Sequence, residues 1–341
     1  MDDKKWMART IELALRGGTD VRPNPMVGCV VVGSTGEALG VGWHQRFGRP
    51  HAEVHALDTL EDVDLSGATL YVNLEPCSFH GKTPPCADLI VERGVGTVVI
   101  GALDPNPRVA GAGAERLRQA GVTLRIGVLE KECRSLNAGF LTRMTLGRPH
   151  VTLKMAQSLD GFAAPQQGTS RWITGEPARK RVHAMRSWAD AVLTGPRTIL
   201  ADDPGLTVRD APGRSPLRIV LDAKGVVPDS AKVLSDGNRT LIVRGPQDPR
   251  GRIDLKSWIQ DVDLSILYVL VEAGPTLSSA FLAEELVDEL AVFTAPILMG
   301  GGMPSFTDPA RETLAQALRP GAVHYEQIGL DMLTTLSLRQ P

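Results

Sequence analysis

Aromatic side chains are scarce in this chain of 341 residues, which contains 7 Phe, 5 Trp and 3 Tyr. Basic side chains are not in excess either: the formal net charge is −2, and residues 1–149 hold equal numbers of basic and acidic side chains. A protein that binds nucleic acid is expected to present a basic surface and aromatic rings for base stacking. The composition therefore favours small-molecule substrates and no nucleic-acid partner.

Long hydrophobic runs and a disulfide framework are also missing. No apolar run approaches the roughly 18 residues of a membrane span, and four cysteines are too few for a disulfide scaffold in a chain of this length. The first residues space Met7, Ile11, Ala14 and Leu15 as one face of an amphipathic helix, unlike a signal peptide. We expect a cytoplasmic protein with no membrane partner.

The length favours two domains. Gly147-Arg148-Pro149 interrupts helix-like sequence before an apolar strand, which predicts domains at 1–146 and 147–341. Strands alternate with helices in both halves, so both are predicted to be α/β. Strands are expected at 28–33, 68–74, 97–102, 151–155, 191–194, 217–221, 240–243, 267–272, 290–295 and 333–338. Helices are expected near the N-terminus and at 53–60, 112–120, 177–188 and 277–286.

A metal-ligand pattern follows the first strand. His51-Ala52-Glu53 is followed by Pro76-Cys77 and then by Cys86, which begins a predicted helix. One imidazole and two thiolates leave the fourth zinc position open, and water bound there has its pKa lowered to about 7. Glu53 can carry a proton from that water to departing ammonia. The pattern H-x-E…P-C-x-x-C is the signature of zinc deaminases, so we predict His51, Cys77 and Cys86 as ligands and Glu53 as the catalytic acid/base.

One spacing departs from that signature. Eight residues separate Cys77 from Cys86 where two are usual, and among them His80 is a rival ligand. A structural zinc site and two unrelated buried cysteines are the alternatives. A structural site has no need of a free carboxylate beside its open position, so Glu53 favours catalysis. We expect His44 and His55 to support or pack against the site rather than to bind the metal.

These motifs resemble a known family, the bifunctional deaminase/reductase of riboflavin biosynthesis. The long step between Cys77 and Cys86 is that family's own spacing. Matching segments in the first half are 23–29 (PNPMVGC), 48–54 (GRPHAEV), 74–78 (LEPCS), 82–86 (KTPPC) and 104–107 (DPNP). In the second half they are 153–154 (LK), 158–161 (SLDG), 172–174 (WIT), 200–204 (LADDP), 206–209 (LTVR) and 271–276 (VEAGPT).

The resemblance implies a fold and two consecutive reactions. The fold is a cytidine-deaminase-like three-layer domain followed by a dihydrofolate-reductase-like domain. The first reaction is zinc-dependent hydrolytic deamination of 2,5-diamino-6-ribosylamino-4(3H)-pyrimidinone 5′-phosphate. The second is NADPH-dependent reduction of the ribosyl group, which gives 5-amino-6-ribitylaminouracil 5′-phosphate. A homo-oligomer is also expected.

The resemblance also assigns residues to the two sites. Substrate contacts in the first half are Asn24, His44 and Lys82. Those in the second half are Ser170, Arg186, Leu206, Arg209 and Glu272. NADPH contacts are Ala156, Trp172, Thr198, Asp202, Gly274, Pro275, Thr276, Leu277, Ser278, Ser279 and Ala280. Near Ala223, relatives can carry a hydroxyl that Ala cannot replace, and the segment 244–271 aligns too loosely for assignment. The preference for NADPH over NADH follows from the resemblance alone.

The residues of the second half say less by themselves. No G-x-G-x-x-G follows its first strand, which argues against a Rossmann site. Gly274-Pro275-Thr276 can present N–H groups to a phosphate, although strand-Gly-helix turns are common. Gly300–Gly302 favours a flexible connection, and Arg186 with Arg209 could clamp a phosphate bidentately. The alternative functions are deamination of another base, such as free cytosine nucleotides or adenine in RNA, and an inactive binding or assembly module.

Overall fold

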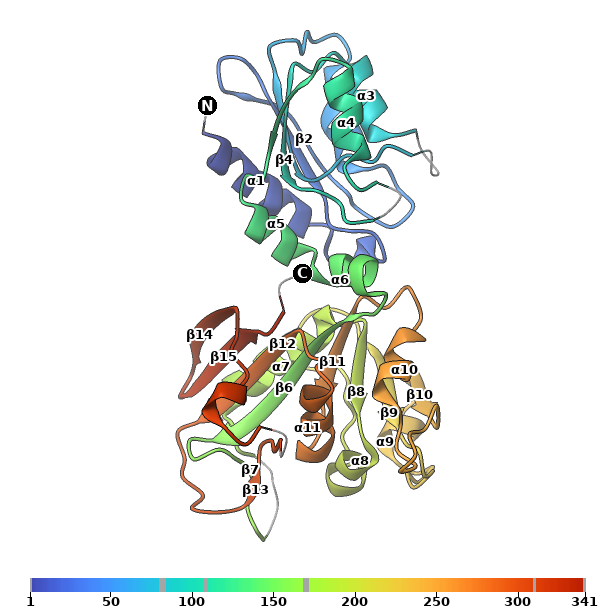
Figure 1. Cartoon of the computed structure of the whole chain (residues 1–341), viewed down its shortest axis with the longest axis vertical. Coiled ribbons are helices and arrows are strands. Elements are labelled where there is room, and N and C mark those ends of the chain that lie inside the picture. Colours follow the sequence, from blue (N-terminus) through green and yellow to red (C-terminus); the bar gives the residue numbers. More distant parts are fainter. Residues whose placement is uncertain (1, 80–83, 107–108, 168–171, 309–310, 340–341) are drawn as a thin grey trace. The chain divides into compact units, whose positions relative to one another are not determined.

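Two compact units, Met1–Gly147 and Arg148–Gln340, make up the chain (Figure 1). The structure is a computed structural model, and it describes residues 2–79, 84–106, 109–167, 172–308 and 311–339. Each unit has its own sheet and its own hydrophobic clusters. No helix within these described ranges is long and apolar enough to cross a membrane.

The first unit is built on a five-stranded sheet of order β2-β1-β3-β4-β5. β1 is antiparallel to its neighbours β2 and β3, whereas β3, β4 and β5 are parallel. Every residue of β1 and β3 is buried, as expected for strands covered on both faces. The strands are β1 (Gly28–Val32), β2 (Ala38–Trp43), β3 (Thr69–Leu74), β4 (Thr97–Ala102) and β5 (Thr123–Ile126).

Helices cover both faces of this sheet. Val30 and Val32 of β1 pack with α1 (Asp3–Leu15) and α5 (Glu130–Leu136), whereas Cys29 and Val31 face the opposite layer. That layer contains α2 (Ala52–Leu57), η2 (Asp58–Leu60), α3 (Cys86–Glu92) and α4 (Ala112–Gln119), and α6 (Ala138–Leu146) ends the unit. The predicted three-layer α/β architecture is confirmed. A Cβ on Gly42 would collide with the carbonyl oxygen of Ala52, so this glycine lets α2 lie directly on β2.

The second unit is built on an eight-stranded sheet of order β10-β9-β8-β11-β6-β12-β15-β14. The six strands from β10 to β12 are parallel, and β15 and β14 extend the sheet antiparallel. The strands are β6 (His150–Ser158), β8 (Ala191–Thr194), β9 (Leu217–Leu221), β10 (Thr240–Val243), β11 (Tyr268–Glu272), β12 (Glu289–Ala295), β14 (Ala322–Ile328) and β15 (Asp331–Ser337). The strands β7 (Phe162–Ala164) and β13 (Met303–Pro304) form a separate two-stranded ribbon.

Helices cover both faces of this sheet too. One cluster joins the sheet to α10 (Leu255–Gln260) and α11 (Pro275–Ala283). Clusters on the other side include α7 (Glu176–Trp188), α8 (Pro196–Asp202) and α9 (Lys232–Ser235). The predicted helix at 277–286 in fact begins at Pro275, and Glu285 has a positive φ of 57°, which stops it. η1 (Gly18–Val21) and η3 (Leu314–Gln316) complete the elements.

The connection at Gly300–Gly302, predicted to be flexible, is anchored instead. The carboxylate of Asp160 accepts hydrogen bonds from the backbone N–H groups of Met299 and Gly300. The following residue, Met303, pairs with Ala164 in the β7–β13 ribbon. A carboxylate far away in the sequence therefore supplies the acceptor for the start of this turn.

Candidate active sites

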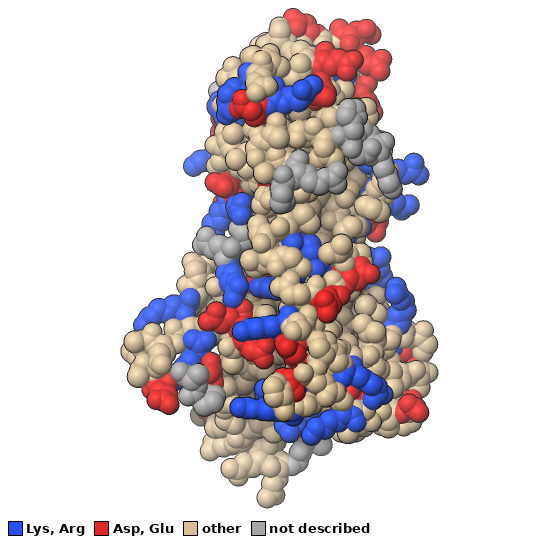
Figure 2. Space-filling view, turned by 45° about the vertical axis from the view of Figure 1, so that its right-hand side comes forward, with Lys and Arg blue, Asp and Glu red and all other residues tan. Residues whose placement is uncertain are grey.

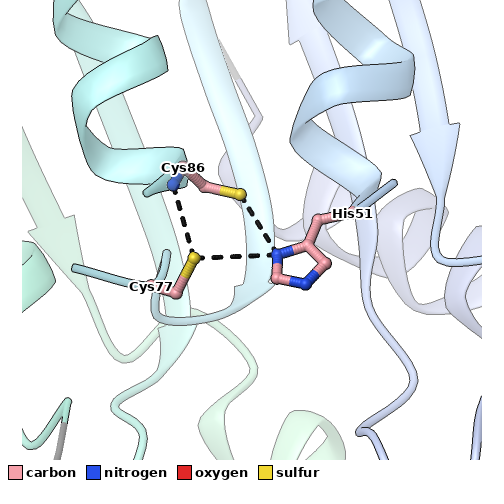
Figure 3. Close-up of side chains that lie close together, drawn as sticks. All are labelled: His51, Cys77 and Cys86. Atoms are coloured by element: carbon pink, nitrogen blue, oxygen red, sulfur yellow. Dashed lines mark hydrogen bonds between the residues drawn. The ribbon is translucent and has the colours of Figure 1, made fainter. Parts of the chain in front are cut away.

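Two helix starts and one loop bring the predicted metal ligands together in the first unit (Figure 3). His51 is the N-cap of α2, Cys86 is the first residue of α3, and Cys77 lies in the loop after β3. His51 Nδ1 lies 3.3 Å from Cys86 Sγ and 3.7 Å from Cys77 Sγ. All three ligand atoms lie within 4.8 Å of one another.

These distances fit a zinc ion. With Zn–S bonds of about 2.3 Å and a Zn–N bond of about 2.0 Å, tetrahedral geometry places sulfur and nitrogen about 3.5 Å apart. Two sulfurs and an imidazole are a donor set that suits zinc. The Cys86 thiol, the backbone N–H of Cys86 and the His51 ring lower the pKa of Cys77 to about 4, which favours the thiolate form that binds metal.

Glu53 lies in the first turn of α2, beside the ligand cluster, and is only 3% exposed. Its Oε2 atom is buried and has no hydrogen-bond partner among the described residues. Burial raises the pKa of this carboxyl group. A buried carboxylate oxygen without a partner is costly, so its retention points to a ligand or a reacting group that it meets during function.

Asn24 and His44, two of the predicted substrate contacts, meet beside His51. His44 Nδ1 donates to the carbonyl oxygen of Pro50 at 3.1 Å, which leaves Nε2 to accept from the Asn24 amide at 3.2 Å. The His44 and His51 rings are edge to face, with centroids 5.6 Å apart. Burial lowers the pKa of His44 and so favours this neutral form. Lys82 and the rival ligand His80 lie outside the described residues.

Glu75, to which the sequence gave no role, supports the loop beside Cys77. Its carboxylate accepts hydrogen bonds from the backbone N–H groups of Asp104, Gly111 and Ala114. These bonds tie the segment that begins with Asp104 to the start of α4. Burial raises the pKa of Asp104 to about 6. A charged residue directly after a fully buried strand was the signal that could have identified Glu75.

A large cavity of about 1530 Å³ is the candidate site of the second unit. Segments that follow the parallel strands β8, β9 and β11 line it, which is where open α/β sheets bind ligands. Small-molecule pockets measure about 300–1,000 Å³, so this cavity has room for two ligands. Predicted residues in its wall are Ala156, Trp172, Thr198, Asp202, Gly274, Pro275, Thr276, Leu277, Ser278, Ala280, Arg186, Leu206, Arg209 and Glu272.

Two of the predicted contacts are not among these wall residues, for different reasons. Ser279 is absent from the cavity wall because it lies on another side of α11, where its Oγ accepts from the backbone N–H of Thr307 at 2.9 Å. Ser170 lies outside the described residues. Ala223, at the position where relatives can carry a hydroxyl, does line the cavity.

A buried ion pair lies in the cavity wall. Arg186 Nε and Nη2 donate to the two carboxylate oxygens of Glu272 at 2.5 and 2.9 Å, and Nη1 donates to the carbonyl oxygen of Thr207 at 3.1 Å. In this arrangement the paired donors of Arg186 bind Glu272, and the predicted clamp of Arg186 and Arg209 on a phosphate stays a prediction. Arg209 also lines the cavity, and its backbone N–H donates to His183 Nδ1 at 3.3 Å.

Lys154 is a further charged residue in this wall. It projects from β6, its Nζ lies 6.0 Å from the centre of the Phe293 ring, and no described residue forms a hydrogen bond or ion pair with it. Burial lowers its pKa, and the nearby Glu272 carboxylate opposes that shift. In the sequence, Lys154 stands out only as part of a matching segment. A lysine inside an apolar strand was the signal for a functional role.

Two helix N-termini meet in the wall of the cavity. α8 begins at Pro196 and α11 at Pro275, and the backbone N–H of Gly274 donates to Thr198 Oγ1 at 3.1 Å. Arg197 Nη1 donates to Thr276 Oγ1 at 2.9 Å. Helix N-termini with a neighbouring arginine suit the phosphates of a dinucleotide, so the donor set fits such a cofactor. On the face shown in Figure 2, basic and acidic side chains are interspersed.

Comparison with known proteins identifies the class. Residues 1–102 match the model of the cytidine and deoxycytidylate deaminase zinc-binding region, and residues 149–334 match that of the RibD C-terminal domain. The chain thus joins a zinc-binding deaminase domain to a reductase domain. It is 42% identical to the riboflavin biosynthesis protein RibD of Escherichia coli, over 93% of this chain and 94% of that protein. For the protein of the same name from Aquifex aeolicus, the identity is 40% and the coverage 97% of each.

Solved structures agree with this class. Acinetobacter baumannii RibD, form 1, superposes with a TM-score of 0.86 at 41% identity, covering 98% of each chain. A Thermotoga maritima structure, described as a diaminohydroxyphosphoribosylaminopyrimidine deaminase/5-amino-6-(5-phosphoribosylamino)uracil reductase, gives a TM-score of 0.83 at 38% identity over 98% of each chain. The chain belongs to the RibD family of bifunctional deaminase/reductases of riboflavin biosynthesis.

Proposed function

We propose that the first unit hydrolytically deaminates 2,5-diamino-6-ribosylamino-4(3H)-pyrimidinone 5′-phosphate and that the second reduces the product, 5-amino-6-(5-phosphoribosylamino)uracil, with NADPH. The observation that carries the first step is the cluster of His51, Cys77 and Cys86, beside which lies the buried Glu53, whose Oε2 atom has no hydrogen-bond partner among the described residues. The observation that carries the second is the cavity with room for two ligands. The Thermotoga maritima relative is described by the same two activities.

In the deamination, His51, Cys77 and Cys86 would hold a zinc ion, which when bound would supply Lewis-acid activation of the attacking water. Glu53 takes a proton as this water adds to the ring carbon that bears the amino group, and it returns the proton to the leaving ammonia. Its raised pKa brings it towards the operating pH, where proton transfer in both directions is efficient. Neutral His44 fixes the Asn24 amide, which is then oriented towards the pyrimidine.

In the reduction, NADPH supplies a hydride. As the ribose ring opens, the Lys154 ammonium group donates a proton to the ring oxygen, and the nitrogen lone pair forms a C1′=N bond. Reduction at C1′ then leaves a ribityl chain with one hydroxyl more than the closed ring had. Lys154 suits this role because burial lowers its pKa and no described residue holds its proton in a hydrogen bond.

Two cations support the choice of NADPH over NADH. Lys224, in the segment after β9, and Arg250, in the segment after β10, line the cavity, and neither side chain has an ion-pair partner among the described residues. The neighbouring Arg252 is paired with Asp248 at 2.7 Å. Lys224 and Arg250 therefore remain to bind the additional phosphate that distinguishes NADPH.

The test is an assay of the purified, zinc-quantified chain with the diaminopyrimidinone ribotide as substrate. Ammonia release and NADPH oxidation are recorded separately. We expect ammonia first and NADPH consumption only after it, in equal amounts. Ammonia without NADPH oxidation would refute the reductase assignment, and absence of both signals with one zinc bound would mean that the first unit acts on another base.

A further inference from the structure

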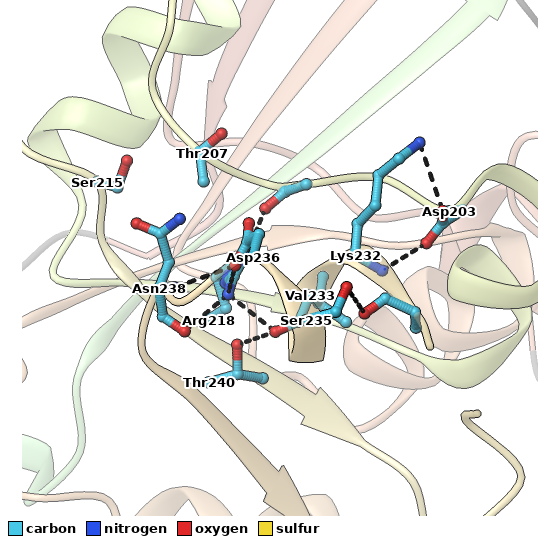
Figure 4. A network of polar contacts seen from close by, with 12 residues as sticks. Asp203, Thr207, Ser215, Arg218, Lys232, Val233, Ser235, Asp236, Asn238 and Thr240 are labelled. Carbon is cyan, nitrogen blue, oxygen red and sulfur yellow. Dashed lines mark hydrogen bonds and ion pairs between the residues drawn. The ribbon is translucent and has the colours of Figure 1, made fainter. Parts of the chain in front are cut away.

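A polar network centred on one buried arginine adjoins the cavity (Figure 4). Asp203, Lys232 and Asp236 of this network are themselves among the residues that line the cavity. The centre of the network is Arg218, on β9, whose side chain is 0% exposed. Nη1 donates to the carbonyl oxygen of Gly205 at 2.8 Å and to Asp236 Oδ2 at 2.7 Å. Nη2 donates to Asp236 Oδ1 at 2.7 Å and to the carbonyl oxygens of Val233 and Asn238 at 2.8 and 2.9 Å.

Gly205 belongs to the loop that joins α8 to β9, here called the substrate loop (residues 203–209). Asp203 and Leu206 have φ angles of 42° and 51°, a region that side chains other than glycine rarely occupy. Such a backbone persists only where its surroundings hold it. The carboxylate of Asp203 accepts from the backbone N–H of Lys232 at 2.8 Å, and the carbonyl oxygen of Thr207 accepts from Arg186.

The loop matters because of what it presents. Leu206, Thr207 and Arg209 all line the cavity, on the side that holds Arg186 and Glu272. The peptide carbonyl held by Arg218 is the one immediately before Leu206. Its direction therefore determines how Leu206 enters its positive φ and where the next three residues point.

We propose that Arg218 is a positioning residue of the reductase: through the Gly205 carbonyl it fixes the substrate loop, while Asp236 fixes Arg218. It does not touch the substrate itself. This inference rests on the proposed reductase function of the second unit. The positioning role accounts for a fully buried arginine at this place in the sheet, since a buried ion pair by itself seldom stabilises a fold more than apolar residues would.

A second buried pair in the same unit provides a matched control. Arg148 donates to both carboxylate oxygens of Asp288 at 2.6 and 2.7 Å, and the two side chains are 4% and 3% exposed. Asp288 also accepts from the backbone N–H of Val151, at the start of the sheet. Neither residue lines the cavity or contacts the substrate loop. Breaking this pair perturbs the fold without the proposed positioning effect.

The experiment compares Arg218→Lys and Asp236→Asn with Arg148→Lys and Asp288→Asn in the full chain. The assay temperature is below the melting temperature of every variant. We expect Arg218→Lys and Asp236→Asn each to raise KM for the deaminated ribotide at least tenfold, and the increase should be larger in Arg218→Lys. KM for NADPH and the rate of ammonia release change less than threefold. The two control variants lower the melting temperature and leave both KM values within threefold of the parent chain.

Hydrogen exchange gives a readout that does not require activity. Peptides covering residues 203–209 exchange at least tenfold faster in Arg218→Lys than in the parent chain, and at the parent rate in Arg148→Lys. A contrary result is an active parent chain with folded Arg218 and Asp236 variants that have the same KM for the deaminated ribotide and the same exchange rate at residues 203–209 as the parent. That result would overturn the positioning role and leave the proposed function standing. If the parent chain does not oxidise NADPH with the deaminated ribotide, the proposed function and this role both fail.

Discussion

Replacing Glu272 with Gln tests whether the buried pair with Arg186 organises the reductase cavity. The side chains of Arg186 and Glu272 are 12% and 9% exposed, respectively, and two hydrogen bonds of 2.5 and 2.9 Å join them. Gln keeps the shape of Glu but offers one acceptor oxygen and no charge. The guanidinium of Arg186 then stays buried with that oxygen and the carbonyl of Thr207 as its partners.

The cost follows from this geometry. Removing one partner of a buried ion pair costs about 3–5 kcal/mol. Because Arg186 keeps two neutral acceptors, we expect the lower limit, about 3 kcal/mol. A domain of this size loses about 2–4 °C of melting temperature per kcal/mol, so the second unit should melt roughly 6–12 °C lower. The control is Glu285→Gln. Glu285 pairs with Arg339, and the two side chains are 68% and 40% exposed, respectively. This substitution should cost no more than about 1 kcal/mol.

The pH dependence has a definite sign. Burial alone raises the pKa of Glu272, but Arg186 outweighs it and the pKa is lower than usual. A lowered folded-state pKa adds stability above the unfolded-state pKa, and this stability is lost as the pH falls through the folded-state value. The difference between the parent chain and Glu272→Gln should thus be complete at pH 7 and shrink in acid.

Calorimetry of the full chain measures both units, and ammonia release reports on the first. We expect Glu272→Gln to lower the melting transition of the second unit and to abolish NADPH oxidation, with ammonia release unchanged. A melting temperature within 2 °C of the parent value at pH 7 would refute the reasoning. So would a difference that grows on acidification, since that would mean that the carboxyl group is not held as a paired anion.

Three further changes test the assigned residues. Glu53→Gln should lower the rate of ammonia release about 10²–10⁴-fold, because the proton carrier is lost. Metal analysis of this variant should still find one zinc. A loss of zinc would contradict a purely catalytic role for Glu53. Lys154→Met should remove most of the NADPH oxidation. In the parent chain, the reduction rate should fall as the pH rises through the lowered pKa of Lys154. If the residual rate of Lys154→Met shows the same fall at alkaline pH, Lys154 is excluded as the acid. The double change Lys224→Ala with Arg250→Ala should raise KM for NADPH about tenfold and leave KM for NADH unchanged; equal effects on both cofactors would refute recognition of the additional phosphate.

The sequence predicts the metal cluster better than the sheet that supports it. His51, Cys77 and Cys86 are recognisable because each occupies a helix start or a Pro-rich loop with characteristic spacing. β2 and β5 were missed for different reasons. β2 contains Gly40 and Gly42, which weaken a strand pattern although they are needed where α2 approaches the sheet. β5 is an exposed edge strand, and so it lacks the apolar run that identifies buried strands.

The polar wall of the reductase cavity was less predictable because its partners are far apart in the chain. Arg186 and Glu272 are separated by 86 positions, and no local pattern indicates that one pairs with the other. The pairing of Arg186 with Glu272 could therefore not be predicted from the sequence. Lys224 and Arg250 lie in irregular segments, which carry no periodicity from which a facing direction could be derived.

Glu53 and Lys154 share a property that connects the two units. Each is a titratable group beside a candidate reaction centre, Glu53 buried and Lys154 half-buried. Neither the Glu53 Oε2 atom nor the Lys154 ammonium group has a hydrogen-bond partner among the described residues. Burial of an unpaired charged group lowers the stability of a fold, and apolar residues of similar size would pack there at less cost. Positions that contradict the local rules of folding in this way are expected at functional sites. Stability and activity should therefore oppose each other at both positions: a neutral residue that abolishes one reaction should also raise the melting temperature of the unit that contains it.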